Sequence, residues 1–440
     1  MLRLKNIFVF CLAFFLASCS FFSSNKKLPE GRRVAVIDLK SDSDTVKAQS
    51  LKIKTSPAEN IVSWPQLNAN AHHLAPNVKA SGTLEEVFSA SFEHGASSRN
   101  FLLSKPIIDN GLIYAQDVNG TVYAFDLKDG KRVFRQKIKP LIQNDSSSAL
   151  NGAGLASDGK KIYALTGFGT VAAIDALTGD MLWRKDLNVP FRTSPALGDG
   201  KLFAITIDNQ LFALNSDDGS VIWKYEISSE DTVLAGGAAP AYDAKTKTLV
   251  AAFSNGEIMA FNARLGYPLF SNNLVNLDDL SAPSSINAVK ASPVITDKKV
   301  IAVGNSRVTL AFDIENGDVL WQRALSGTQT PLVNNEAIYL ITQEGQLVAL
   351  SLKDGSTLWQ ISPLEHLKIK ERAQIHLYGP IMVQGRLVVT ASDGVVYMFK
   401  PENGTKISQF DLKQDLPFAP VAAEQTVIFT TNNAHLIAFR

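Results

Sequence analysis

A short pattern of apolar and polar positions recurs along most of the chain. In each copy, an alternating apolar segment is followed by a turn close to D-x-x-[TDN]-G and by a second alternating segment. Alternation with a period of two indicates β-strands, and a glycine supplies the positive φ that a tight turn needs. The pattern therefore predicts strand–turn–strand units. Five copies align without gaps and two more fit the same frame: residues 120–134, 169–183, 209–223, 256–270 and 345–359, with 307–321 and 394–408.

The spacing of the copies predicts the architecture. They recur about every 45 residues, and an eighth copy stops at the last residue, Arg440; this period is typical of a four-stranded propeller blade. Another strand precedes each copy and often begins at a proline, as at Lys105-Pro106, because an inner edge strand needs no donor there. The eighth copy lacks an outer strand, and residues 86–92 carry the matching pattern. We therefore predict an all-β, eight-bladed β-propeller of four-stranded antiparallel blades over residues 61–440, with the last blade closed by an N-terminal strand.

One aromatic position is repeated four residues after the turn glycine. We interpret these rings as packing wedges between neighbouring blades, rather than as a platform for sugars or bases. The seventh copy departs from the pattern and has Ser408 at this position. The aromatic residues are Phe134, Trp183, Trp223, Phe270, Trp321 and Trp359, with Phe88 in the N-terminal strand.

The N-terminus is typical of a secreted chain. A basic start precedes an apolar stretch, residues 7–16, which is too short to span a bilayer as a helix. The small residues before Cys19 resemble the lipobox of bacterial lipoproteins, in which the cysteine is acylated after cleavage. We expect a lipoprotein signal peptide over residues 1–18, lipidation of Cys19 and a tether over residues 19–60. A plain signal peptide with a chance cysteine is the alternative.

Composition and motifs narrow the chemistry. Lys and Arg number 43 against 42 Asp and Glu, which argues against a nucleic-acid-binding protein that works through bulk positive charge. The two cysteines, Cys11 and Cys19, lie outside the folded body, so a disulfide framework or a cysteine metal site is excluded there. Residues 154–160 nearly spell a phosphate-binding loop, but Lys161 replaces its Ser or Thr and a hairpin is expected. The six histidines lack metal-binding spacing and are expected at the surface. We expect no catalytic residue, no metal and no cofactor.

The repeat resembles that of the pyrroloquinoline quinone (PQQ) enzyme family over residues 84–440. With the lipobox, the bare propeller resembles the BamB family, lipoproteins of the outer-membrane β-barrel assembly (BAM) complex. Segments 205–211, 234–238 and 286–288 resemble its α-proteobacterial form. The resemblance implies a non-catalytic scaffold at the periplasmic face of the outer membrane. Such a scaffold binds the periplasmic POTRA region of BamA, works with the other BAM subunits and aids the folding and insertion of outer-membrane proteins. Whether unfolded outer-membrane proteins bind the propeller directly stays open.

The same resemblance implies contact residues. The family's contact loop has apolar residues followed by an arginine, and its best match is Val189, Phe191 and Arg192. Phe191 would be the apolar anchor and Arg192 the charged one, both types being enriched in interface cores. The alternative is that Phe191 tucks under its own loop. The family's acidic pair on a neighbouring loop has no match here, where Asn287 occupies the corresponding segment.

Two other functions stay open. By family resemblance, a PQQ- and Ca²⁺-dependent dehydrogenase would need a Ca²⁺ held by carboxylate and amide oxygens, a catalytic aspartate, and aromatic or disulfide walls over the cofactor. The family's vicinal cysteine pair cannot form in the folded body. An envelope ligand-binding propeller, for example for a polysaccharide, would need exposed aromatic residues gathered on one face. The aromatic residues found by the repeat occupy packing positions instead.

Overall fold

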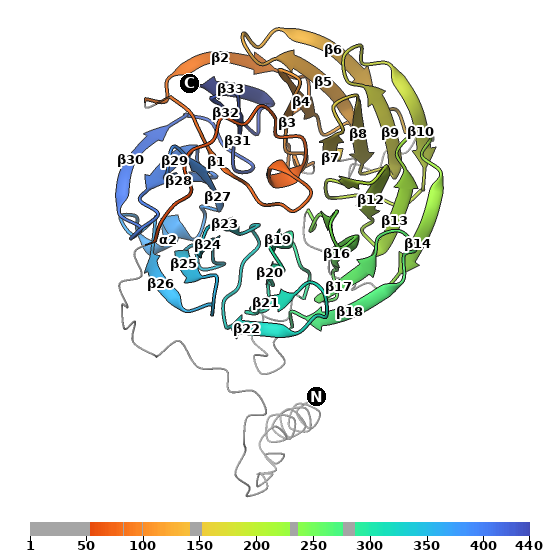
Figure 1. Ribbon diagram of the computed structural model, residues 1–440. Coiled ribbons are helices and arrows are strands. Elements are labelled where there is room, and N and C mark those ends of the chain that lie inside the picture. Colours follow the sequence, from red (N-terminus) through yellow and green to blue (C-terminus); the bar gives the residue numbers. More distant parts are fainter. Residues whose placement is uncertain (1–52, 82, 99, 141–151, 229–235, 276–286) are drawn as a thin grey trace, which may run out of the picture. The chain divides into compact units, whose positions relative to one another are not determined.

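The fold is a ring of eight antiparallel sheets, which confirms the predicted eight-bladed propeller (Figure 1). The structure is a computed structural model that describes residues 53–440 except 82, 99, 141–151, 229–235 and 276–286. The chain divides into two units, Met1–Leu39 and Lys40–Arg440, and the ring belongs to the second. The expected signal peptide, Cys19 and most of the expected tether lie outside the described residues.

Each blade orders its strands from the central axis to the circumference. Six of the eight inner strands have three residues, whereas β7 and β27 are longer; in blade 1, the middle two strands are buried and the outer strand β6 is largely exposed. Blades 1 to 4 consist of β3 (Ile107–Asp109), β4 (Leu112–Gln116), β5 (Thr121–Asp126) and β6 (Arg132–Lys137); β7 (Gly152–Ser157), β8 (Lys161–Thr166), β9 (Thr170–Asp175) and β10 (Met181–Asp186); β11 (Ala196–Gly198), β12 (Lys201–Ile205), β13 (Gln210–Asn215) and β14 (Val221–Glu226); and β15 (Ala241–Asp243), β16 (Thr248–Ala252), β17 (Glu257–Asn262) and β18 (Pro268–Asn273). Blades 5 to 8 consist of β19 (Val294–Thr296), β20 (Lys299–Val303), β21 (Thr309–Asp313) and β22 (Val319–Arg323); β23 (Leu332–Asn334), β24 (Ala337–Ile341), β25 (Leu347–Ser351) and β26 (Thr357–Ile361); β27 (Leu377–Val383), β28 (Arg386–Ala391), β29 (Val395–Phe399) and β30 (Lys406–Asp411); and β31 (Val421–Ala423), β32 (Thr426–Thr430) and β33 (His435–Phe439) with β2 (Glu86–Ser91).

The two ends of the propeller sequence meet in blade 8, as predicted. β2 pairs antiparallel with β33, and Phe88 lies opposite Ala438. Just beyond this ladder, the backbone groups of Glu85 and Arg440 exchange hydrogen bonds with N···O distances of 2.9 and 3.0 Å. The Arg440 guanidinium also donates to the carbonyl oxygen of Leu127, in blade 1, at 2.6 Å. The ring is therefore closed by backbone pairing and not by a covalent link.

Each repeated aromatic ring lies against the turn glycine of the next blade. A Cβ at Gly179 would come within 2.5 Å of Phe134 Cγ, and one at Gly219 within 2.6 Å of the Trp183 ring. Only glycine leaves room for this approach at the positive φ of the turn. The indole N–H of Trp183 then donates to the carbonyl oxygen of Ser216 at 3.1 Å. The pairs are Phe88 with Gly130, Phe134 with Gly179, Trp183 with Gly219, Trp223 with Gly266, Phe270 with Gly317, Trp321 with Gly355 and Trp359 with Gly404.

This pairing explains the exception at Ser408. Its blade is followed by blade 8, whose outer strand β2 comes from the N-terminal side of the propeller sequence. No covalent hairpin turn joins β33 to β2, so blade 8 has no turn glycine for a ring to cover. The aromatic residue and the glycine are thus lost together.

Residues 53–80, here called the closing segment, cross one end of the ring and contact every blade. The segment includes a short 3-10 helix, η1 (Leu67–Ala69), and β1 (Asn77–Val78), which adds a fifth, parallel strand beside β27. The contacts with blades 1 to 8 are, in order, Trp64 with Ile108, Pro65 with Ser157, Gln66 with Leu197, Ala71 with Tyr242, His72 with Ile295, Ser56 with Asn334, Asn77 with Met382, and Ile61 with Glu424. Residues 53–60, assigned to the tether from sequence, therefore contact the propeller.

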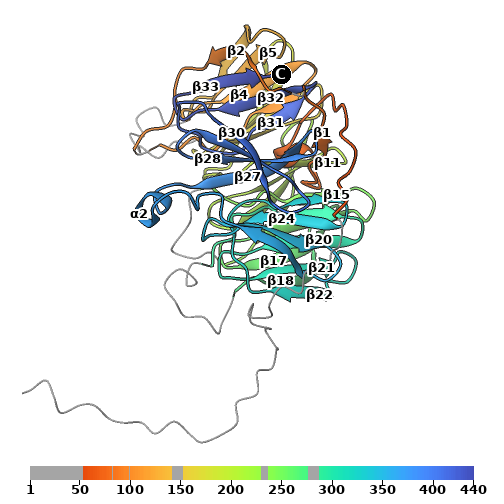
Figure 2. The same cartoon turned by 90° about the vertical axis from the view of Figure 1, so that its left-hand side faces the viewer.

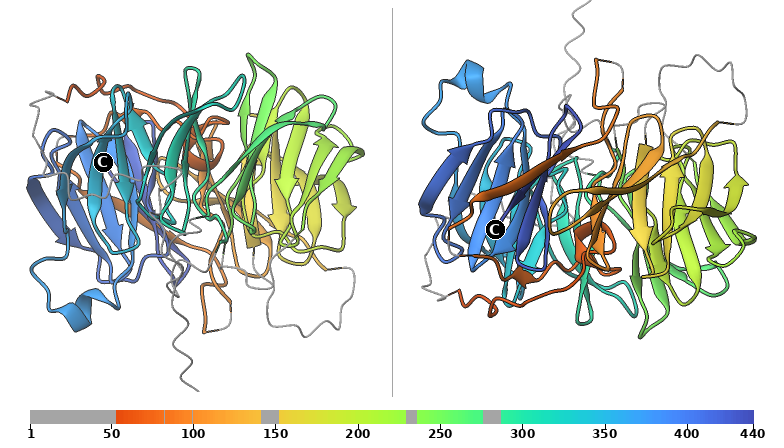
Figure 3. Two further views of the ribbon diagram at one scale, coloured as in Figure 1. Left: turned by 90° about the horizontal axis from the view of Figure 1, so that it is seen from below. Right: turned by 90° about the horizontal axis from the view of Figure 1, so that it is seen from above.

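The closing segment defines two faces of the ring. It lies on the face where the first and second strands of each blade meet, here called the closed face. The loops that join one blade's outer strand to the next blade's inner strand lie on the other, open face, together with α2 (Ile369–Arg372). Figures 2 and 3 show α2 and the closing segment on opposite faces.

Candidate functional site

The loop between β10 and β11 carries the residues that the sequence singles out on the open face. It is fixed at both ends by backbone hydrogen bonds: Leu187 N donates to Gly169 O at 2.8 Å, and Ile207 N donates to Pro190 O at 2.8 Å. A Cβ at Gly169 would come within 2.7 Å of Val189 N, so the loop packs directly on the turn below it. The half-buried Val189 is therefore held by backbone contacts on a rigid support.

Phe191 is placed differently from the expectation. Its side chain is fully buried in a cluster that includes Tyr163, Leu202 and Phe212. Its backbone pairs with Thr206. A ring with no exposed surface cannot meet a partner, and this corrects its expected role as an exposed anchor. The apolar surface of Phe191 is already removed from water between the blades, so contact with a partner would bury no more of it.

Arg192, by contrast, keeps part of its side chain accessible. It is half-buried at the edge of a groove lined by Ile207, Gly236 and Ala288, from the loops of blades 3 to 5. No described carboxylate forms an ion pair with it, and partial burial lowers the pKa of its guanidinium. A partly desolvated guanidinium with no ion-pair partner among the described residues can donate paired hydrogen bonds to a carboxylate.

The segment of Asn287 reaches the same groove. Ala288 and Val289, which follow it, line the groove beside Arg192. The Asn287 side chain itself accepts a long hydrogen bond, 3.4 Å, from the hydroxyl of Ser306. The structure thus brings together two loops that lie far apart in sequence. Part of the intervening segment, residues 276–286, lies outside the described residues.

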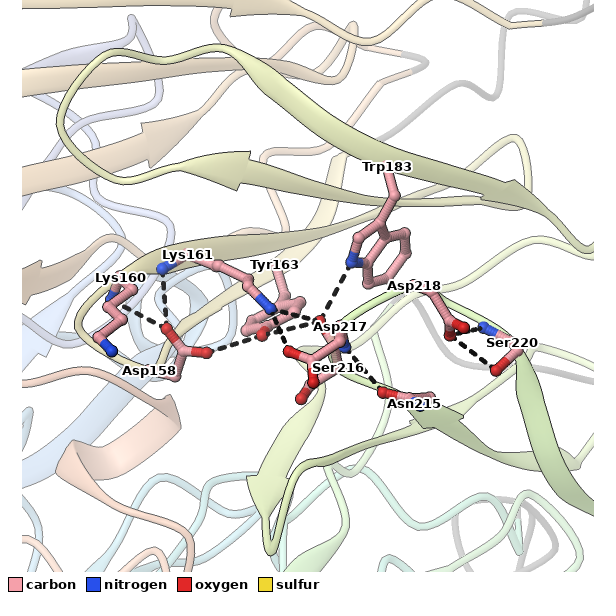
Figure 4. A network of polar contacts seen from close by, with 10 residues as sticks. All are labelled: Asp158, Lys160, Lys161, Tyr163, Trp183, Asn215, Ser216, Asp217, Asp218 and Ser220. Carbon is pink, nitrogen blue, oxygen red and sulfur yellow. Dashed lines mark hydrogen bonds and ion pairs between the residues drawn. The ribbon is translucent and has the colours of Figure 1, made fainter.

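The near phosphate-binding loop is a hairpin between β7 and β8, as expected (Figure 4). The Asp158 carboxylate accepts the backbone N–H groups of Lys160 and Lys161 at 2.9 and 2.7 Å. Lys161 Nζ reaches the neighbouring blade and pairs with Asp217 at 2.6 Å. Lys161 thus links two blades, and these described residues form no phosphate-binding loop.

The described residues contain neither a metal-binding cluster nor a membrane-spanning helix. In the described part of the chain, no group of three His, Cys, Asp or Glu side chains is arranged to hold a metal ion. The described lining of the central cavity holds lysine and arginine side chains and neither Asp nor Glu, which does not fit the carboxylate-rich donor set that Ca²⁺ prefers. None of the helices in the described ranges is long and apolar enough to cross a bilayer.

Sequence reasoning missed two charged residues of that central cavity, Lys105 and Lys290. The repeat held a signal for the first. The residue before the opening proline is small in the other blades that have one, as at Ser194, Ala239 and Ala419, and is lysine only in blade 1. Lys290 lies in a loop between two blades, outside the repeated pattern, so its place at the axis could not be inferred from the repeat.

Known proteins were compared with the chain. A family model described as outer membrane protein assembly factor BamB matches residues 119–361, more than half of the chain. The outer membrane protein assembly factor BamB of Yersinia pestis is 24% identical over 367 residues, which cover 83% of this chain and 91% of that protein. The crystal structure of BamB from Moraxella catarrhalis matches with a TM-score of 0.69 and 19% identity, over 81% of this chain and 100% of that one. A quinohemoprotein alcohol dehydrogenase from Comamonas testosteroni matches with a TM-score of 0.69 and 12% identity, over 87% of this chain and 81% of that one. At such identities, the structural likeness shows the shared fold alone.

Proposed function

The chain belongs to the family of the outer membrane protein assembly factor BamB, and from this premise we propose that it is a non-catalytic scaffold of the BAM complex. It binds the periplasmic POTRA region of BamA through the open face and so aids the folding and insertion of outer-membrane proteins. The other BAM subunits complete the assembly. The dehydrogenase with the same fold is a distant likeness, and the described cavity lining does not suit its calcium chemistry.

The observation that carries the proposal is the placement of Arg192. It is the charged residue of the β10–β11 loop, it borders a groove between three blades, and no described carboxylate neutralises it. Loops on a rigid scaffold are the usual carriers of binding residues. A carboxylate of BamA is the group that this guanidinium recognises best.

An apolar contact on the same face is supplied by α2 and not by Phe191. Ile369 is 82% exposed. It lines a groove of about 670 Å³ together with Gln343, Arg372 and Ile375. An exposed apolar side chain beside polar groups fits the edge of a protein interface. We propose that this groove extends the BamA contact beyond Arg192.

Acylation of Cys19 places the propeller at the periplasmic face of the outer membrane in this proposal. Several acyl chains anchor a protein far more stably than one. Replacing Cys19 by Ala is expected to release the protein from the membrane fraction, and mass spectrometry of the mature N-terminus measures the acyl chains directly.

The proposed partner is tested by capture from membranes. The full chain is captured from envelope membranes in mild detergent, and the recovered BamA is quantified. Arg192→Glu is expected to reduce BamA at least tenfold, because it puts a like charge opposite the partner's carboxylate. Arg264→Glu, an exposed residue of the closed face, is the matched control and retains BamA.

The outcomes separate the claims. If BamA is recovered equally with both variants, the complex stands and the Arg192 contact is wrong. If BamA is absent even with the unaltered chain, the scaffold function fails. Phe191→Ala is unsuitable here, because removing a buried ring disrupts the blade interface.

A further inference from the structure

A cavity of about 100 Å³ enters the centre of the ring from the open face and ends on the closing segment. Leu67 of the closing segment lines it, with Leu102 and Phe418 among the apolar walls. Its charged lining groups in the described residues are the side chains of Lys105, Lys290 and Arg192, and neither Asp nor Glu is among them. The cavity is therefore a closed-ended space with positive charge.

Lys105 reaches the axis because of its position in the repeat. It directly precedes Pro106 and β3, at the point where each blade comes nearest to the centre. The residues at the same position in blades 3, 5 and 6 are Ser194, Ser292 and Thr330, and they line the same cavity. The other seven blades have no lysine at this position. Lys105 is therefore the one long cationic side chain that the repeat places at the cavity, beside smaller residues of the other blades.

Lys290 is held by a glycine of the preceding blade's loop. A Cβ at Gly236 would come within 3.1 Å of Lys290 Cε, and the φ of Gly236 is +87°. The lysine stem therefore runs across this glycine toward the centre. A side chain on Gly236 would displace it, so the glycine serves as a positional support for the ammonium group.

The two ammonium groups share one poorly solvated space. Burial and the charge of Lys290 together lower the pKa of Lys105 to about 8. Burial also lowers the pKa of Lys290. No Asp or Glu of the described residues lines this space. A bound anion would offset the cost of desolvating the two cations.

Neutral donors complete the lining. The Ser292 hydroxyl accepts the backbone N–H of Ala239 at 2.9 Å, and the Thr330 hydroxyl accepts that of Ser292 at 3.2 Å. Each hydroxyl oxygen is engaged as an acceptor and still has its hydrogen to donate. Charged and neutral donors together match an oxyanion, which accepts several hydrogen bonds at once.

We propose that this cavity binds a small oxyanion, a carboxylate or phosphoryl group, between Lys105 and Lys290, with Arg192 at its mouth and the Ser292 and Thr330 hydroxyls as further donors. The site shares Arg192 with the proposed BamA contact, but its floor and its two lysines lie inside the ring and are not part of that contact. It assigns a ligand-binding role to the axis of a propeller that otherwise acts as a scaffold.

The test measures binding of two oxyanion probes to the full chain by isothermal titration calorimetry. The probes are inorganic phosphate and acetyl-dialanine, with acetyl-dialanine amide as the uncharged control. Lys105→Met and Lys290→Met keep the length of the stem and remove the charge. Lys353→Met, at an exposed lysine of the closed face, is the matched control.

We expect saturable binding of at least one probe with one site per chain, weakened at least tenfold by either cavity variant and unchanged in the Lys353 variant. Preference for phosphate identifies a phosphoryl ligand, and preference for the free peptide over its amide identifies a carboxylate. Absence of saturable binding for both probes overturns the proposal. Equal affinity in the cavity variants also overturns it.

Affinity should also fall as the pH rises from 7 to 9, because the protonated Lys105 binds the anion and its pKa is about 8. The other titratable groups that face it are Lys290, Arg192, His73 and Tyr378. His73 is neutral in this range, since burial lowers its pKa to about 4. Burial raises the pKa of Tyr378. Affinity that stays constant from pH 7 to 9 would contradict the assignment of Lys105 as a ligand-binding cation.

Discussion

The two faces of the ring differ in how far their polar and charged groups are paired with other groups of the protein. On the closed face, the closing segment satisfies backbone groups of seven blades and side-chain amides of blade 6, and the aromatic rings cover the turn glycines. On the open face, Arg192, Lys105 and Lys290 stand around a cavity without a described carboxylate. Paired backbone groups and packed rings therefore lie at one end of the axis, and cations that cost stability but can bind ligands lie at the other.

The largest expected difference between the faces follows from Trp64→Ala. Trp64 is 2% exposed and exchanges backbone hydrogen bonds with Ile108. Loss of such a ring is expected to cost about 3–5 kcal/mol of the free energy of unfolding. Ile369→Ala, at the exposed helix of the open face, is expected to change it by less than about 0.5 kcal/mol. Chemical denaturation measures both, and equal losses would contradict the division of roles.

His73 gives the closed face its own pH dependence. The sequence suggested a surface residue, but the side chain is 2% exposed and its Nδ1 lies 2.8 Å from the Pro293 carbonyl oxygen. Burial lowers its pKa to about 4 from 6.5. Between these pH values the unfolded chain binds the extra proton, so stability is expected to fall as pH drops from 6.5 to 4. The loss reaches about 3 kcal/mol.

His73→Gln is expected to remove this acid dependence, while His366→Gln, at an exposed position on the open face, keeps it. The measurement is the free energy of unfolding at intervals from pH 4 to 7. A wild-type curve that is flat over this range would show that His73 is not held neutral.

Substitution of two glycines distinguishes the cost of backbone strain from the cost of steric overlap with a neighbouring ring. Gly179 and Gly345 have φ of +81° and +75°, but only at Gly179 would an added methyl group come within 2.5 Å of a ring, that of Phe134. Gly345 lies on the open face, and a methyl group added there would have nothing within 4 Å. Gly345→Ala is expected to cost about 1 kcal/mol from strain alone. Gly179→Ala is expected to cost about 1–3 kcal/mol more. Equal costs, measured by chemical denaturation, would mean that the ring moves aside freely.

Lys105 is expected to give a second pH dependence, at alkaline pH. Its pKa is lowered to about 8 from 10.5 by burial and by Lys290. Between these values the unfolded chain binds the extra proton, so stability is expected to rise with pH through this window. Lys105→Met should remove the rise and melt at the same temperature as the wild type, or higher, at pH 7. A lower melting temperature would show that Lys105 has a stabilising partner.

The sequence predicted the ring because its signal is repeated. Each copy repeats the strand pattern and the turn glycine, so one misread copy changes little. The departure at Ser408 also fits, once the N-terminal strand is recognised in blade 8. Local patterns of this kind survive in the structure because the same contact is made by nearly every blade.

The features that the sequence did not predict occur once in the molecule and are not repeated from blade to blade. The closing segment makes a different set of contacts with each blade, many of them through its backbone, so its sequence shows no period. Phe191 sits in an irregular loop, where the pattern does not tell inward from outward side chains. The central cavity is assembled from loops of several blades, and only the exceptional Lys105 marked it in the sequence.

The pairing of β2 with β33 has a consequence for the order of events during synthesis. The final strand reaches the last residue but one, and Arg440 itself pairs with Glu85. A growing chain therefore has seven blades available before the eighth can be completed, and the ring stays open until β33 has been delivered. Such a long-range contact makes folding slow. A chain that lacks β33 leaves β2 without its partner strand, so the ring of such a chain has a gap at blade 8.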